Sequence, residues 1–140
     1  MSSQTPFSAR TAAPVSKPML WTGRIMSALP VLLILLGSSI KLARTSAAIE
    51  GTIKMGYPGR LVVLVGIIEL TCVVIYVIPA TSVLGAILLT GLLGGATATL
   101  VRVGDPSIPL PVITGTLVWG GLFFRDPRIR ALIPLRKAAD

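Results

Sequence analysis

The residue best placed to do chemistry in this sequence is Glu69, a carboxylate inside an apolar run. It stands in the stretch GIIELTC, residues 66 to 72, which is otherwise apolar enough to cross a membrane. An ionised acid near the centre of a bilayer costs about 3 kcal/mol on insertion scales, so a cation is expected beside it. The candidates are Lys41 and Arg102, which end two other apolar blocks. We therefore predict a polar cluster of Lys41, Glu69 and Arg102.

Three kinds of chemistry are open to this cluster. Glu69 could form a structural ion pair that fixes the packing of three helices. It could instead hold a polar ligand, such as the headgroup of a quinone, or it could relay protons, because intramembrane charges are functional candidates by default. We favour the ion pair as the simplest of the three, and the sequence pattern leaves the other two open.

The residue types that the sequence lacks exclude several classes of site. There is no histidine and a single cysteine, Cys72. His-ligated haem, zinc and iron sites, an intrachain disulfide and a Ser/His triad are therefore excluded. We expect no metal site and no enzyme activity of the chain on its own, and a bound quinone is the one cofactor left open. Cys72 is interpreted as a small buried hydrophobe, and Tyr57 and Tyr76 as interface residues rather than acids or bases.

The composition indicates that lipid surrounds these residues. Of the 140 residues, 53% are hydrophobic and 13% are charged, and the mean hydropathy is +0.86. A water-soluble fold of this length has too little interior to bury so much apolar surface. The apolar residues fall into blocks of membrane-spanning length, which predicts an all-α, integral membrane four-helix bundle. The spans are predicted at residues 20–42, 61–79, 83–101 and 108–124.

Two tails are expected to flank a membrane domain of residues 19–125. Residues 1–18 are rich in Ser, Thr, Ala and Pro without a helical period, which predicts a disordered tail. Residues 126–140 are basic, and Asp126 with Pro127 would start a helix there. An amphipathic surface helix held by anionic lipid and an ordered basic tail are both open for this segment.

The connection between the first two spans, residues 43–60, is too long for a bare turn. Ser46 as a polar start, Glu50 as an acid in the first turn and Gly56 as a stop predict a short helix here. Its apolar edge would lie on the bundle or on the lipid headgroups.

The net charge of +8 is carried by residues in tails and connections, without interleaved aromatic side chains. That distribution argues against nucleic acid as a partner and favours a role in membrane orientation. Eight cations lie on the side of the termini and five on the other, so we predict cytoplasmic termini. The eight are Arg10, Lys17, Arg24, Arg125, Arg128, Arg130, Arg136 and Lys137, and the five are Lys41, Arg44, Lys54, Arg60 and Arg102.

The third span is rich in small residues. Gly85, Gly91, Gly94 and Gly95 lie along it, and Gly91 and Gly95 have the GxxxG spacing. Small residues let helices approach closely in lipid, where no hydrophobic force drives helices together. We predict that these glycines pack helices, and a cofactor groove is the second interpretation.

The four apolar runs, with the glycines of the third and the turn before the second, together resemble the DoxX-like family of small four-helix bacterial membrane proteins. The resemblance covers almost everything after the N-terminal tail and implies a four-span bundle in the bacterial inner membrane. It is carried by WTGRIMSALPVLLILLGSSIKL at 21–42, Gly56-Tyr57-Pro58, GIIELTCVVIYVIP at 66–79, TSVLGAILLTGLLGGATATLVRVGDP at 81–106 and WGGLFFRDPRIRALIPLR at 119–136.

The resemblance implies less about activity. Relatives in the wider group include small subunits linked to thiosulfate:quinone oxidoreduction, partners in membrane oxidoreductase complexes, and receptor-assembly chaperones. Lys41 and Glu69 match the family pattern and are carried over as candidate functional residues of unknown role. Family members often have His where this sequence has Leu100, which weakens any transfer of metal or proton chemistry.

We therefore expect a multi-pass accessory protein that serves a quinone-linked or other membrane oxidoreductase, an expectation that rests mainly on analogy. One alternative is a small-molecule or ion carrier, and another is a structural assembly factor or chaperone for a membrane complex. The expected partners are the lipid bilayer and other membrane subunits, and the sequence leaves the oligomeric state open.

Overall fold

A computed structural model describes residues 15–132, and this part of the chain is all helical, without a strand. The prediction of an all-α bundle is confirmed. Part of the predicted N-terminal tail and the end of the predicted C-terminal tail lie outside the described residues. The elements are α1 (Lys17–Leu42), α2 (Ser46–Lys54), the 3-10 helix η1 (Gly59–Leu61), α3 (Val62–Val77), α4 (Ser82–Val103), α5 (Pro109–Arg125) and α6 (Pro127–Leu132).

The helix starts follow from local chemistry. Lys17 and Pro18 belong to α1 rather than to the tail, because proline fits the first turn, where its missing N–H has no partner to lose. The N-cap of α2 is Thr45, whose Oγ1 accepts a hydrogen bond from the Ala48 N–H at 3.3 Å. The predicted cap at Ser46 is thus wrong by one residue, and Glu50 lies beyond the first turn of α2.

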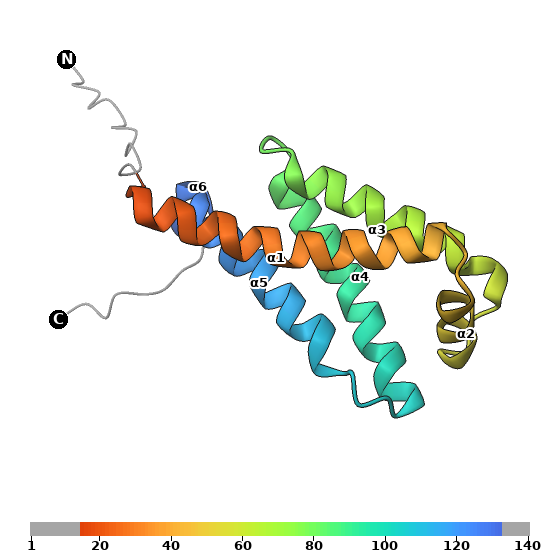
Figure 1. Cartoon of the computed structure of the whole chain (residues 1–140). Coiled ribbons are helices and arrows are strands. Elements are labelled where there is room, and N and C mark those ends of the chain that lie inside the picture. The colour runs from red at the N-terminus through yellow and green to blue at the C-terminus, as the bar shows by residue number, and fades with distance from the viewer. Residues whose placement is uncertain (1–14, 133–140) are drawn as a thin grey trace, which may run out of the picture.

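The four long helices form an antiparallel bundle. α1 packs against α3 and α5, and α4 packs against the same two helices. Successive long helices run in opposite directions, so that α1 begins at the end of the bundle where α6 lies, and α2 lies at the other end (Figure 1). This arrangement places every connection between long helices at one of two ends.

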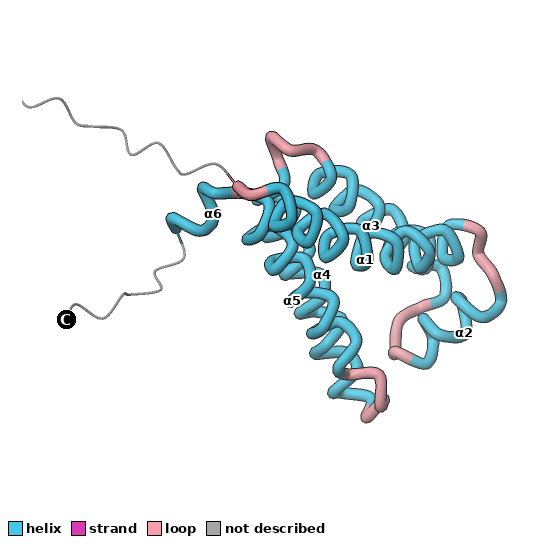
Figure 2. The backbone as a smooth tube through the Cα atoms, turned by 60° about the vertical axis from the view of Figure 1, so that its left-hand side comes forward, coloured by secondary structure: helices cyan, strands magenta, loops and turns pink. Residues whose placement is uncertain are grey.

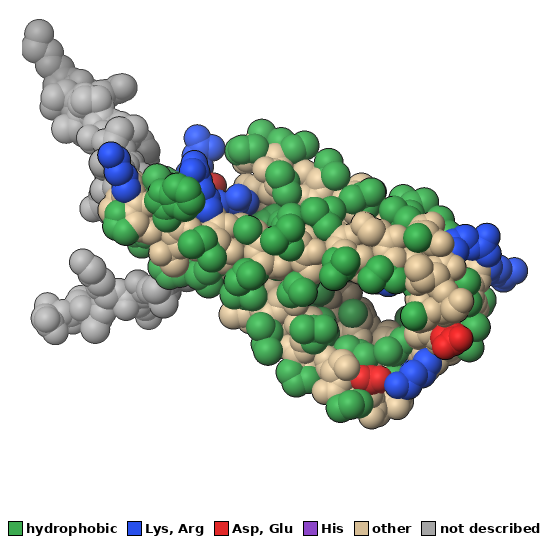
Figure 3. Space-filling view, in the orientation of Figure 1, with side chains coloured by type: hydrophobic (Ala, Val, Ile, Leu, Met, Phe, Trp, Pro, Cys, Tyr) green, Lys and Arg blue, Asp and Glu red, His purple; other side chains and the backbone are tan. Residues whose placement is uncertain are grey.

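The exterior of the bundle is apolar on all sides of the helices. Leu32 on α1, Ile87 on α4 and Ile113 on α5 are each more than half exposed, and Figure 3 shows hydrophobic side chains along the whole visible face. Helices that are apolar all round belong in lipid when they lie at a surface. α1, η1 with α3, and α4 are long and apolar enough to cross a membrane. α5, with 17 residues, measures about 26 Å, so a fourth crossing remains a prediction.

The main cluster of buried apolar side chains lies in the half of the bundle nearest α6, whereas Val62 and Leu100 are buried outside it, toward α2. Tyr76 of α3, Leu89 of α4 and Leu122 of α5 are almost fully buried in this cluster, and Ile129 of α6 closes it. Toward α2, by contrast, the α1–α3 pair diverges from the α4–α5 pair in both views (Figures 1 and 2). Apolar packing is therefore denser in one half of the bundle, and polar contacts add to it in the other half.

The glycines of α4 have different surroundings. A Cβ on Gly85 would collide with the backbone of Tyr76, so the absence of a side chain allows α3 and α4 to cross there. A Cβ on Gly91, Gly94 or Gly95 would meet no atom within 4 Å. Gly85 thus packs within the chain, and the other three leave an open surface on α4.

We predict that Gly85→Ala lowers the free energy of unfolding by about 1–3 kcal/mol, because the added methyl group forces α3 and α4 apart. Gly91→Ala is the matched control, and it should leave the stability unchanged or raise it by up to about 1 kcal/mol through helix propensity. The measurement is thermal or SDS-induced unfolding in mild detergent, followed by circular dichroism. Equal stability of the two variants would contradict the close crossing at Gly85.

Candidate functional site

The candidate site lies where α1 contacts α3, in the half of the bundle nearest α2. Lys41 Nζ lies 2.6 Å from Glu69 Oε1, and the two side chains are 28% and 15% exposed. Gly66 makes this approach possible, because a Cβ there would lie only 3.1 Å from the Cβ of Lys41. The structure therefore brings Lys41 and Glu69 together as an ion pair between two helices.

Ser38, one turn before Lys41, adds a hydroxyl to the pair. Its Oγ lies 3.2 Å from Glu69 Oε2 but only 2.7 Å from the carbonyl oxygen of Ile34, and one hydroxyl proton serves one acceptor at a time. The ammonium of Lys41 has three N–H groups, and within residues 15–132 Glu69 is its one acceptor. The pair is neutral as a whole, yet it retains the capacity to donate to and accept from a further polar group.

Arg102 does not join the pair. Its Nη2 donates to the carbonyl oxygen of Met55 at 2.8 Å, and its guanidinium lies 5.9 Å from the centre of the Tyr57 ring. Arg102 stands at the α2 end of α4, whereas Glu69 is eight residues, or about 12 Å, along the helix from Leu61. Arg102 therefore bonds the segment around α2 instead of Glu69. Of the predicted three-residue cluster, the structure brings together Lys41 and Glu69.

A second polar group, here called the α2 clamp, links the α2 segment to the end of α4 and the turn that follows it. It consists of Lys54, Tyr57, Arg102 and Asp105. Lys54 Nζ lies 3.1 Å from Asp105 Oδ2, and the Tyr57 hydroxyl lies 3.1 Å from Thr99 Oγ1. The clamp closes the end of the bundle beyond the Lys41–Glu69 pair.

Asp105 is the best-buried member of the clamp, at 9% exposure. The backbone N–H of Ser107, which donates to Oδ1 at 2.9 Å, together with the Ser107 side chain and Lys54, lowers the pKa of Asp105 from 3.8 to about 2. Sequence inspection missed this residue. The Asp-Pro-Ser turn was a usable signal for a side chain that bonds its own backbone, but nothing local signals a partner 51 residues earlier.

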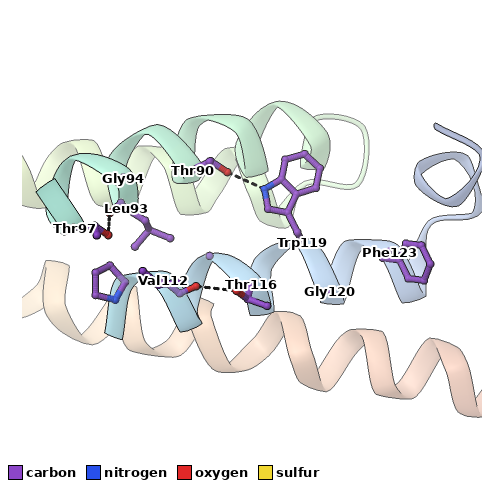
Figure 4. A pocket seen from close by; sticks show the side chains of 11 residues that line it. Thr90, Leu93, Gly94, Thr97, Val112, Thr116, Trp119, Gly120 and Phe123 are labelled. Carbon is purple, nitrogen blue, oxygen red and sulfur yellow. Dashed lines mark hydrogen bonds between the residues drawn. The ribbon is translucent and has the colours of Figure 1, made fainter. Parts of the chain in front are cut away.

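A groove of about 610 Å³ lies between α4 and α5. Figure 4 shows Trp119 reaching across it, where Nε1 donates to Thr90 Oγ1 at 2.8 Å. Thr97 and Thr116 donate to carbonyl oxygens of their own helices, so the groove presents an almost wholly apolar surface. Its lining is Thr90, Leu93, Gly94, Thr97, Pro111, Val112, Gly115, Thr116, Trp119, Gly120 and Phe123.

The two tyrosines interpreted as interface residues differ in exposure. Tyr76 is fully buried, not exposed to headgroups, and its hydroxyl donates to the Val118 carbonyl oxygen at 2.9 Å. Tyr57 is 44% exposed and belongs to the α2 clamp. Within residues 15–132 no group of three or more carboxylate or thiol side chains is placed to hold a metal ion.

We predict energetic coupling between Lys41 and Glu69. Glu69→Gln should cost about 2 kcal/mol in the unmodified chain, less than a fully buried pair would lose, because both side chains keep some exposure. The same change should cost less than about 1 kcal/mol in a Lys41→Met background, where no cation is left unpaired. Unfolding of the four variants in detergent measures the coupling, and costs that simply add would rule it out.

We predict that the α2 clamp resists acid to an unusual degree. The pKa of Asp105 is lowered in the folded chain. The stability that its ionised carboxylate gives to the clamp is therefore complete above pH 3.8 and is lost as the pH falls through about 2. A spin label at Gly51→Cys on α2, in a Cys72→Ala background, reports the release of α2 as faster label motion. Gly51 suits the label because a Cβ there meets nothing within 4 Å.

The control for this experiment is Asp105→Asn, in which the label should move fast at every pH. In the parent chain the motion should stay constant from pH 7 to about 4 and increase below about 3. A transition near pH 5, or identical spectra for the two variants, would show that Asp105 does not hold α2.

One of three comparisons with known proteins finds a match, and it is to a family model. A search of curated proteins and a search of solved structures found no match to the chain. The family model for the DoxX-like family matches residues 25–121, which is more than half of the chain and contains Lys41, Glu69 and Arg102. The matched range also contains α2, α3 and α4 in full. With its apolar helices and this match, the chain is a membrane protein that belongs to the DoxX-like family.

Proposed function

We propose that this protein is an accessory subunit of a larger membrane complex and that a transmembrane helix of its partner lies in the groove between α4 and α5. The observation that carries the proposal is the open glycine surface beside that groove. A Cβ on Gly91, Gly94 or Gly95 of α4 would meet no atom of residues 15–132 within 4 Å, although small residues in a membrane helix are typical of close helix contacts.

The shape and chemistry of the groove support a helix as the occupant. Along α5 the lining runs from Pro111 to Phe123, a length of about 18 Å, or more than three helical turns. The polar side chains in the lining are already bonded within the chain, so the occupant needs no matching donors or acceptors. Gly94 and Gly115 let a second backbone come close, which is the geometry of helix pairs in lipid.

The partner we propose is an oxidoreductase that uses a quinone, in the bacterial inner membrane. This choice rests on the family resemblance, since relatives include subunits of such complexes. The residues at the Lys41–Glu69 pair fit a quinone headgroup, because Lys41 retains N–H groups that can donate to a carbonyl oxygen. The eight cations on the side of the termini support an orientation with both ends in the cytoplasm.

The ion pair favours a second candidate function, a carrier for a small polar molecule or ion. A carboxylate that is 15% exposed and a lysine that is 28% exposed, inside an apolar bundle, form a polar site that a solute could reach. A carrier would show solute flux into vesicles that Glu69→Gln abolishes. An accessory subunit would show no such flux, whatever residue stands at position 69.

We predict that a photoreactive amino acid at Thr97 or Thr116, in the wall of the groove, cross-links to one partner membrane protein in native membranes. The control is the same photoreactive residue at Leu32, which is 63% exposed on α1. Gly94→Leu fills the groove and should abolish the cross-link at Thr116 while leaving the fold intact, because Gly94 has open space around it. Mass spectrometry identifies the partner.

The proposal requires that the partner be part of a quinone-linked enzyme and that deletion of this chain lower quinone reduction in membranes. A partner whose abundance falls on deletion, while its activity per molecule is unchanged, would identify an assembly factor instead. Equal cross-linking from the groove and from Leu32, or none from either, would contradict the docking surface.

A further inference from the structure

A small pocket of about 230 Å³ lies near α6, where α1, α3 and α5 meet. Two arginines line it, Arg24 from α1 and Arg125 from the last turn of α5. The remainder is mainly apolar, with Ala28, Val31 and Val77. The pocket therefore has a cationic part and a hydrocarbon part.

Both guanidinium groups are held in place by aromatic rings. Arg24 Cζ lies 5.9 Å from the centre of the Trp21 ring, and Arg125 Cζ lies 5.0 Å from the centre of the Tyr76 ring. The hydroxyl of Tyr76 is occupied, because it donates to a carbonyl oxygen of α5. Arg125 Nη2 also donates to the Tyr76 carbonyl oxygen at 3.5 Å. The donors left for a ligand are therefore the remaining N–H groups of the two arginines, which stacking orients in advance.

Within residues 15–132 no carboxylate forms an ion pair with Arg24 or Arg125. The ion pairs of that range are Lys41–Glu69 and Lys54–Asp105, both elsewhere in the bundle. The nearest acid in the sequence, Asp126, accepts the backbone N–H of Arg128 and so caps α6. Two like charges that share a pocket repel each other, and an anion between them would remove that repulsion.

The surroundings of the pocket add further positive charge. Figure 3 shows Lys and Arg side chains gathered at the end of the bundle where α1 begins and α6 lies. Arg130 of α6 contributes two buried nitrogens, Nε and Nη2, that have no hydrogen-bond partner in the described part of the chain. Cations at a membrane surface attract anionic lipid by about 1 kcal/mol each.

We infer that this pocket binds the headgroup phosphate of an anionic phospholipid through Arg24 and Arg125, with an acyl chain over Ala28, Val31 and Val77. A guanidinium matches phosphate oxygens with paired N–H groups. Trp21 beside Arg24 is the residue type that marks the headgroup level, and Val77, 52% exposed, continues the pocket toward the hydrocarbon. The inference is independent of the partner and of the groove between α4 and α5.

The test measures lipid binding to the full chain, purified in a non-ionic detergent. The probes are a short-chain phosphatidylglycerol, the phosphatidylcholine with the same acyl chains, and inorganic phosphate. Native mass spectrometry and the shift in thermal unfolding report binding. The expected result is that phosphatidylglycerol binds and stabilises the chain, whereas phosphatidylcholine and inorganic phosphate have much smaller effects at equal concentration.

Arg24→Gln and Arg125→Gln should each weaken phosphatidylglycerol binding by about fivefold, and the double variant by about 25-fold if the two contributions are independent. Arg60→Gln, at the opposite end of the bundle, should bind as the parent does. Arg125→Lys keeps the charge and should retain more binding than Arg125→Gln. Thermal unfolding of each variant without lipid is a separate control, because it identifies any variant that is unstable in itself.

Three outcomes would overturn the inference. Equal binding of phosphatidylglycerol and phosphatidylcholine would show that charge plays no part. Parent-like phosphatidylglycerol binding by a stably folded Arg24→Gln, Arg125→Gln double variant would place the lipid elsewhere. Inorganic phosphate binding as tightly as the lipid, and lost in the same variants, would assign the pocket to a free anion.

Discussion

The Lys41–Glu69 ion pair is the contact on which the half of the bundle nearest α2 depends. Lipid surrounds the helices, so helix association there gains nothing from removing apolar side chains from water. The main buried cluster lies at the other end, around Tyr76 and Leu122. Close approach at Gly66 and the charge pair beside it hold α1 to α3 beyond that cluster. The same low dielectric that makes a lone Glu69 costly makes the pair an effective link.

The two ends of the bundle differ in whether a carboxylate pairs with the cations. Near α2 the carboxylates of Glu69 and Asp105 each have a lysine partner, and the Arg102 guanidinium is satisfied by a carbonyl oxygen. Near α6 the arginines stack on aromatic rings, and no described carboxylate pairs with them. Polar contacts at the first end join elements of the fold to one another. Those at the second end leave positive charge available to the membrane surface.

Small residues have two separate uses along α4. Gly85 is enclosed, because the backbone of Tyr76 occupies the space that a side chain would need. Gly91, Gly94 and Gly95 are about two to three turns further along and open outward. A single helix thus contributes to the interior of its own bundle with one glycine and offers a smooth surface with three more. Glycine is a poorer helix former than alanine, so three exposed glycines lower the stability of α4. Contact with another molecule at these positions would offset that cost.

The amino-acid sequence by itself determined the helices, because apolar runs and their stop signals act over a few residues. The predicted spans at 61–79 and 83–101 lie within two residues of Gly59–Val77 and Ser82–Val103 at each end. The sequence also indicated that Glu69 needs a cation. It did not determine that Lys41 and not Arg102 supplies it, that Tyr76 is buried, or that Lys54 reaches Asp105. Those outcomes depend on which helices are neighbours and how far along their axes they meet, and only the tertiary structure decides both.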